Sequence, residues 1–128
     1  MKYLIALAVL LAAACQADET VTAYTDGTRV FTLQSIDGIP FGATATIDLS
    51  EAGKITGQAP CNRYFAAQSA PYPWFMAGPI GSTRMACPDL VSETTFFTAL
   101  ELMTLAEVVG DTLILSNDTK SEMVFQAP

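Results

Sequence analysis

The sequence contains no histidine, and it is poor in basic residues: 6 lysines and arginines stand against 13 acidic residues. Without histidine, Ser-His-Asp and Cys-His catalysis are excluded, and a zinc site, which needs about four ligands, is not expected. Nucleic-acid backbones are bound through clustered lysine and arginine, which this chain lacks. No Walker or G-x-G-x-x-G phosphate loop is present. We therefore expect no metal, no cofactor and no nucleic-acid partner.

The remaining catalytic arrangements have weak support. A Ser-Lys dyad would have to use Lys54 or Lys120, which stand in polar, turn-like surroundings where a lysine stays charged. Paired carboxylates are formally available in the C-terminal half at Glu93, Glu101, Glu107 and Asp111. These residues fall on polar helix positions or hairpin turns, where solvation is the ordinary explanation. We expect no catalytic residue, and an enzyme with a carboxylate site is the less favoured alternative.

The N-terminus has the layout of a secretory signal. Residues 1–14 begin with Lys2, continue with an apolar run and end in small residues. The run is shorter than the roughly 20 apolar residues of a membrane-spanning helix. The stretch 11–15 resembles the lipobox of bacterial lipoproteins, in which the cysteine is acylated, although Leu11 stands one place further from Cys15 than usual. Ordinary cleavage after Ala14 or Ala17 is the alternative.

These features predict an exported protein. We expect a signal peptide over residues 1–14, lipidation of Cys15 and membrane contact through that N-terminal lipid. Gln16 after the cysteine favours an outer-membrane lipoprotein facing the periplasm, with a soluble periplasmic protein as the alternative. Removing Lys2 with the signal leaves 5 basic and 13 acidic residues, a net charge of 5 − 13 = −8. Residues 15–28 are polar and lack hydrophobic periodicity, which predicts a flexible tether.

Period-two alternation predicts three strands in the next part of the chain. They cover residues 30–36, with Phe31 and Leu33 on one face, and residues 43–49 and 54–59. Asp37-Gly38 and residues 50–53 are turn signals, and Pro60 has no N–H to continue the last strand. The second and third strands are expected to form an antiparallel hairpin.

The C-terminal part predicts one helix and then more strands. Asp89 is placed to cap a helix, and apolar residues recur at three- and four-residue spacing at Phe96, Phe97, Leu100 and Met103. Residues 107–109 and 113–115 predict a hairpin, and residues 123–125 a last strand. A further strand over 74–77 is less clear. The order of elements lacks βαβ units and indicates an α+β fold.

The segment 57–88 holds two cysteines, the single tryptophan and five of the seven prolines. Cys61 and Cys87 lie 26 positions apart in a chain expected to be exported, which predicts a disulfide. A redox-active pair is the alternative, but such cysteines usually stand two residues apart at the start of a helix.

The same segment supplies the candidate binding residues: Arg63, Arg84, Tyr64, Tyr72, Trp74 and Phe75. A disulfide would bring both arginines together, where they could bind a carboxylate or a lipid phosphate. The structural alternative is that each arginine bonds loop carbonyls or pairs with a nearby acid. These aromatic residues, together with Phe65, could line an apolar slot, or they could form core and loop packing.

Several motifs resemble the META domain, or HslJ-like, family of small bacterial envelope proteins. In order along residues 29–126 they are Gly57 with Cys61-Asn62-Arg63-Tyr64, then Ile80 with residues 82–87, then Glu93, Phe96 and Leu100, and last Gly110-Asp111, Leu113 and Leu115. Phe31 departs from the family, where many members carry tryptophan. We assign residues 29–128 to such a domain.

The resemblance implies an antiparallel, incompletely closed β-barrel with one helix packed against it, and it agrees with the disulfide, since members tend to share or lose this cysteine pair together. Members are linked to heat shock, antibiotic tolerance, motility and virulence without an agreed reaction. The fold also resembles a lipid-binding pilot lipoprotein of type III secretion. We expect a non-catalytic envelope protein that binds another envelope protein or an apolar ligand, or that protects the envelope under stress.

Overall fold

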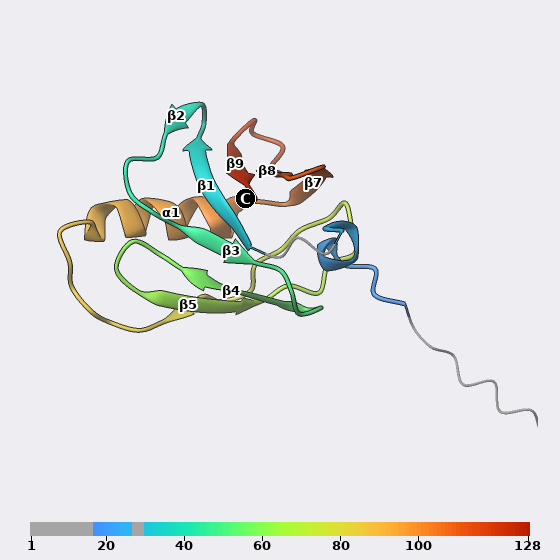
Figure 1. Ribbon diagram of the computed structural model, residues 1–128, viewed down its shortest axis with the longest axis horizontal. Helices are drawn as coiled ribbons and strands as arrows, with labels where there is room; N and C mark the ends of the chain where they lie inside the picture. The colour runs from blue at the N-terminus through green and yellow to red at the C-terminus, as the bar shows by residue number, and fades with distance from the viewer. Residues whose placement is uncertain (1–16, 27–29) are drawn as a thin grey trace, which may run out of the picture.

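The computed structural model describes residues 17–26 and 30–128 (Figure 1). The predicted signal peptide and the lipidation of Cys15 lie outside the described residues. One α-helix packs on an antiparallel sheet that does not close, as predicted. In the described part the sheet has nine strands: eight follow the order β6-β5-β4-β3-β1-β9-β8-β7, and β2 pairs with β1 alone.

The elements have the following bounds. A 3₁₀ helix, η1, covers Val21–Tyr24, and the helix α1 covers Leu90–Leu102. The strands are β1 (Val30–Ile36), β2 (Ile39–Pro40), β3 (Thr46–Asp48), β4 (Lys54–Gln58), β5 (Arg63–Ala67), β6 (Gly81–Ser82), β7 (Leu105–Val109), β8 (Thr112–Ser116) and β9 (Glu122–Gln126).

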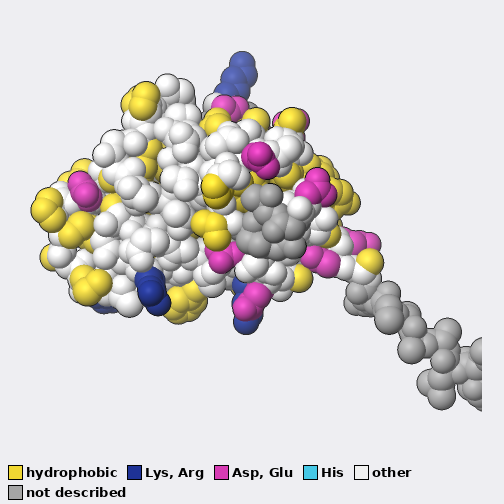
Figure 2. Space-filling view, in the orientation of Figure 1, with side chains coloured by type: hydrophobic (Ala, Val, Ile, Leu, Met, Phe, Trp, Pro, Cys, Tyr) yellow, Lys and Arg dark blue, Asp and Glu magenta, His cyan; other side chains and the backbone are white. Residues whose placement is uncertain are grey.

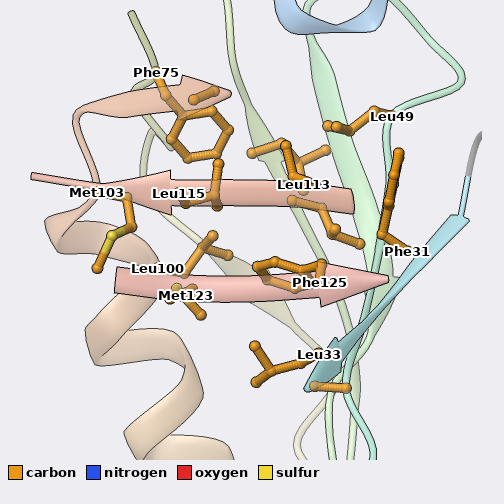
Figure 3. Close-up of a cluster of buried hydrophobic side chains, with 14 of the residues drawn as sticks. Phe31, Leu33, Leu49, Phe75, Leu100, Met103, Leu113, Leu115, Met123 and Phe125 are labelled. Carbon is orange, nitrogen blue, oxygen red and sulfur yellow. The ribbon is translucent and has the colours of Figure 1, made fainter. Parts of the chain in front are cut away.

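The core lies between α1 and the inner face of the sheet. Leu100 of the helix and Met103, which directly follows it, face Leu115 of β8 and Met123 of β9, and all four are fully buried (Figure 3). Every second residue of β1, β5, β8 and β9 points into this layer, which is the alternation expected of a sheet with one solvated face. The single apolar layer therefore positions both the helix and the central strands.

The sequence expectations missed the short strands β2 and β6, and the strand expected over residues 43–49 covers only Thr46–Asp48. Two longer segments also differ. Residues 63–67 form β5, which pairs with β4 over its whole length, although no strand was expected there. Residues 74–77 form no strand, and Trp74 makes only an isolated bridge to Leu105. Pro73 and Pro79 flank that segment and have no N–H to donate, so a regular ladder cannot extend through it.

The N-terminal segment was expected to be a flexible tether, but its described residues pack on the domain. Val21 is 1% exposed and belongs to the core. Tyr24 stacks on Tyr72 with ring centroids 4.0 Å apart, and the Tyr72 N–H donates to the Glu19 carbonyl at 2.7 Å. Val21 and Tyr24 stand three residues apart, the spacing that brings side chains to one side of a 3₁₀ helix. The folded domain therefore begins before residue 29.

A buried glutamine holds the long loop that spans the opening between β5 and β7. Gln68 is 1% exposed, and its Oε1 accepts from the backbone N–H groups of Ala70 and Met76 at 3.0 and 3.1 Å. Downstream, the Gly78 N–H donates to Ala67 of β5, while the Phe75 N–H donates to Thr104 just before β7. The loop thus connects the two sides of the open sheet.

Gly57 of β4 is a position where the fold requires the absence of a side chain. A Cβ there would collide with the Thr46 carbonyl and would lie 2.8 Å from Cε1 of Tyr64. Tyr64 is 2% exposed and donates from its hydroxyl to that carbonyl at 2.7 Å, so neither group can move without breaking this bond. We expect Gly57→Ala to lower the free energy of unfolding by about 1–3 kcal/mol, as overpacking does.

Gly42 supplies the matched control for this substitution. A Cβ at Gly42 would meet no atom within 4 Å, and its backbone does not adopt a left-handed conformation. Gly42→Ala should therefore leave the stability within about 0.5 kcal/mol of the wild type, as surface substitutions usually do. Urea unfolding of the two variants measures the difference, and equal stabilities would show that the close approach at Gly57 is not a constraint.

Candidate functional site

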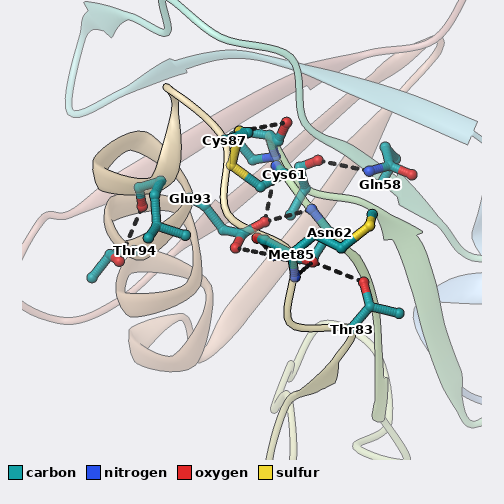
Figure 4. The surroundings of a disulfide bond; sticks show 11 residues. Gln58, Cys61, Asn62, Thr83, Met85, Cys87, Glu93 and Thr94 are labelled. Atoms are coloured by element: carbon teal, nitrogen blue, oxygen red, sulfur yellow. Dashed lines mark hydrogen bonds between the residues drawn. A yellow bond between two sulfur atoms is a disulfide. The ribbon is translucent and has the colours of Figure 1, made fainter.

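A buried carboxylate in the first turn of α1 organises the most elaborate polar cluster of the described residues. Glu93 is 4% exposed, and its Oε1 accepts from the backbone N–H groups of Cys61 and Asn62 at 3.0 and 2.8 Å (Figure 4). Its Oε2 accepts from Nδ2 of Asn62 at 2.7 Å. The expectation that Glu93 is simply solvated was wrong, because three N–H donors replace the water that a buried carboxylate loses.

The Asn62 side chain extends this cluster to the loop before α1. Its Oδ1 accepts from the Met85 N–H at 2.7 Å and from the Thr83 hydroxyl at 2.9 Å. Its Nδ2 donates to the Met85 carbonyl at 3.0 Å in addition to Glu93. The amide therefore uses both donors and both acceptor positions, and it fixes residues 83–85 against the turn between β4 and β5.

A disulfide joins the same turn to the same loop. Cys61 and Cys87 are bonded, with their Cα atoms 5.6 Å apart, which confirms the predicted pair. Two independent links, one covalent and one polar, thus hold loop 83–87 in place.

The start of α1 differs from the expectation in one detail. Asp89 occupies the N-cap position, but its side chain makes no capping hydrogen bond. Its φ and ψ of −95° and 19° depart from the extended conformation that directs a capping side chain at the first turn. At this end of the helix it is the Glu93 carboxylate, not that of Asp89, that accepts backbone hydrogen bonds.

An open hollow of about 560 Å³ lies between β6 and the N-terminal half of α1. Asn62 and Glu93 lie in its lining, and so does loop 83–86. The apolar part of the lining consists of Phe65, Ile80, Met85, Leu90 and Phe97. Phe65 and Met85 are 62% and 63% exposed, which is unusual for such large apolar side chains. The polar cluster and the disulfide therefore hold one wall of an apolar surface hollow.

The structure places both predicted arginines beside Phe65. Arg84 lines the same hollow, and Arg63 lines a neighbouring hollow of about 490 Å³ that also contains Phe65. The salt bridge found in the described ranges joins Lys54 to Glu51 at 3.2 Å and involves neither arginine. In that part of the chain no hydrogen bond or ion pair engages either guanidinium, so the structural role considered for them from the sequence is not observed.

The four predicted aromatic residues are not brought to this hollow. Tyr64 and Phe75 are 2% exposed and belong to the core, and burial, with the Asp48 charge second, raises the pKa of the Tyr64 hydroxyl above its usual value. Tyr72 accepts from the Val108 N–H at 3.2 Å at the edge of the sheet. Trp74 is 58% exposed and lies beside Leu105, on the side of β7. The aromatic slot proposed from the sequence does not form from these residues.

Neither the charged side chains nor the metal-ligating side chains of the described residues form a second candidate site. On the face shown in Figure 2, the basic side chains stand apart from one another and form no continuous patch. Within the described ranges, no cluster of three or more His, Cys, Asp or Glu side chains has an arrangement that could hold a metal ion. No helix in those ranges has the length and apolar character needed to cross a membrane.

Comparison with known families gives a match over most of the chain. A family model described as the META domain matches residues 23–128. The chain belongs to the META domain family. This match begins within η1, in agreement with the packing of Val21 and Tyr24 on the META domain. The family is not a known enzyme family.

Two solved structures resemble this META domain. An NMR structure of a protein from Burkholderia xenovorans has a TM-score of 0.63 and 23% sequence identity, with coverage of 90% of this chain and 93% of the other. A second NMR structure has a TM-score of 0.58 and 22% identity, with coverage of 77% and 88%. A comparison with curated proteins gives no match. These likenesses show the fold of the META domain and nothing of its activity.

Two groupings of residues in this META domain were not foreseen, although Phe65 had been considered for an apolar slot and Glu93 as a carboxylate. Phe65 follows Arg63 by two positions on β5, so the alternation of that strand places both side chains on its outer face. Recognising β5 would have predicted this pair. Met85, Leu90 and Glu93 come together only through contacts between distant segments, and no local pattern marks them.

Proposed function

We propose that this META domain is a non-catalytic binding module of the cell envelope and that the hollow between β6 and α1 is its binding surface. The observation that carries the proposal is the exposure of Phe65 and Met85 beside Arg84, which has no acidic partner among the described residues. Exposed apolar surface of this kind marks interaction sites in soluble domains. The disulfide and the Asn62 cluster keep that surface in one conformation, which lowers the entropic cost of binding.

The hydrogen bonds that the Glu93 carboxylate accepts support a binding role for the hollow over a catalytic one. Glu93 is the carboxylate that lines the hollow, and both of its oxygens accept hydrogen bonds from Cys61 or Asn62. A general acid or base needs an oxygen within reach of the substrate proton. A carboxylate held by three internal donors acts instead as a structural anchor for the loop.

We further propose that the protein is exported and anchored at the outer membrane through a lipid on Cys15. A disulfide between Cys61 and Cys87 persists in an oxidising compartment, which supports export. In Figure 1 the first described residues, drawn in blue, lie on one side of the domain, while the loop that leads into α1 lies at the opposite end. An anchor at Cys15 would therefore leave the hollow directed away from the membrane and available to a partner.

Site-directed photo-cross-linking in the native host tests this proposal. A photoreactive amino acid replaces Phe65 in one variant and Val109 in a control, since Val109 has a similar exposure of 57% but lies on β7 at the far edge of the sheet. We expect a discrete adduct from position 65 and none from position 109. Adducts of equal yield from both positions, or from position 109 alone, would refute the hollow as the binding surface. Mass spectrometry of the same samples reports whether Cys15 carries acyl chains.

A further inference from the structure

Two positively charged guanidiniums lie at or next to the hollow of this acidic protein, while Glu93, the carboxylate in the same lining, accepts hydrogen bonds from N–H groups of Cys61 and Asn62. The chain has a formal net charge of −7, yet Arg84 lines this hollow and Arg63 lines the neighbouring one, and neither has an acidic partner in the described ranges. The other two basic residues of those ranges are different: Lys54 is paired with Glu51, and Lys120 lies in the turn between β8 and β9. A local field of this sign favours an anionic group at the hollow.

The walls of the hollow favour an apolar group at the same place. Phe65, Met85 and Leu90 are 62%, 63% and 44% exposed, and all three line it. Its volume of about 560 Å³ falls within the range of small-molecule sites, which is about 300–1,000 Å³. A ligand that satisfies both features has an apolar body and an anionic head.

We propose that the hollow binds a single-chain carboxylate amphiphile, a fatty acid anion, with its carboxylate at Arg84 and its alkyl chain along Phe65, Met85 and Leu90. The single guanidinium in the lining balances the single charge of a carboxylate and offers it two parallel N–H donors. Glu93 lies in the same lining, and its negative charge keeps the ligand carboxylate away from the Asn62 side. The inference rests on the proposed function of the hollow as the binding surface.

The test uses the signal-free domain and two ligands with the same tail, dodecanoate and dodecyltrimethylammonium, at concentrations below micelle formation. Backbone amide shifts in NMR titrations give both the affinity and the place of binding. We expect dodecanoate to bind with shift changes at Phe65 and Gly81, and the cationic ligand to bind at least about tenfold more weakly. Arg84→Gln should weaken dodecanoate binding by about tenfold, the effect of losing a charged hydrogen-bond donor. Lys120→Gln, the matched control, should leave it unchanged.

A second pair of variants separates this inference from the proposed function. Phe65→Ser should abolish binding, whereas Val109→Ser should retain it. Equal or tighter binding of the cationic ligand, no effect of Arg84→Gln, or no binding of dodecanoate would overturn the fatty acid inference. The binding surface itself would still stand if Phe65→Ser weakened the cationic ligand or if position 65 cross-linked in the host. Tight dodecanoate binding that Phe65→Ser does not change would place the ligand outside the hollow and overturn the fatty acid inference alone, whereas equal cross-linking from positions 65 and 109 would overturn the proposed function.

Discussion

Glu93→Gln is expected to lower the free energy of unfolding by about 2–3 kcal/mol, the cost of leaving a buried polar group unsatisfied. The glutamine oxygen can still accept from the backbone N–H groups of Cys61 and Asn62. Its NH₂ group, however, replaces Oε2 and faces Nδ2 of Asn62, so that two donors oppose each other. Asn62 cannot turn over, because its Oδ1 already accepts from Thr83 and Met85.

A double-mutant cycle isolates this contact from the rest of the fold. Asn62→Asp alone places a second carboxylate oxygen against Glu93 and should also destabilise. In the double variant N62D/E93Q the glutamine NH₂ can donate to the new carboxylate, so the two effects should offset each other by about 1–3 kcal/mol. Glu101→Gln, an exposed residue of the same helix, is the control and should change the stability by less than about 0.5 kcal/mol. Strictly additive single effects in urea unfolding would contradict the donor and acceptor assignment.

Removing the disulfide with the double variant C61A/C87A should lower the stability by about 3.5 kcal/mol. This value follows from the loop-closure entropy for a separation of 26 residues. The loss is large beside the roughly 5–15 kcal/mol that stabilises an ordinary domain. The unfolded chain also becomes less compact without the cross-link, so the urea m-value should rise.

Urea unfolding of the oxidised wild type and of C61A/C87A measures this effect, with Trp74 fluorescence as the signal. Chemical reduction of the wild type is the internal control, and it should reproduce the midpoint of the double variant. A change below about 1 kcal/mol would show that the polar cluster of Asn62 and Glu93 holds the loop without the covalent link.

The strands that alternate strongly could be read from the sequence. Phe31 and Leu33 of β1, and Ile55 of β4, are separated by polar residues, and period two alone places them in the core. Strand β5 was not recognised, because Ala66 and Ala67 have low strand propensity and prolines follow within a few residues. Its pairing with β4 determines its structure, and that is a contact between segments.

The candidate site could be predicted only in part, for the same reason. The disulfide followed from two of the three cysteines in a chain expected to be exported, and the arginines followed from their nearness to those cysteines. The burial of Glu93 could not be predicted from the sequence, because a glutamate in the first turn of a helix is ordinarily exposed and is favoured there by the helix dipole. Its three donors come from Cys61 and Asn62, about thirty positions earlier in the chain, and no local pattern reveals them.

Amide hydrogen exchange at Met85 reports whether Asn62 holds the wall of the hollow in place. The Met85 side chain is 63% exposed, so its loop would exchange rapidly if it were held only at its ends. Because the Met85 N–H donates to Asn62 Oδ1 at 2.7 Å, we expect slow exchange in the wild type. In Asn62→Ala, exchange should accelerate at Met85 while β1 and β9 keep their protection. An unprotected Met85 amide in the wild type would contradict a pre-formed binding surface.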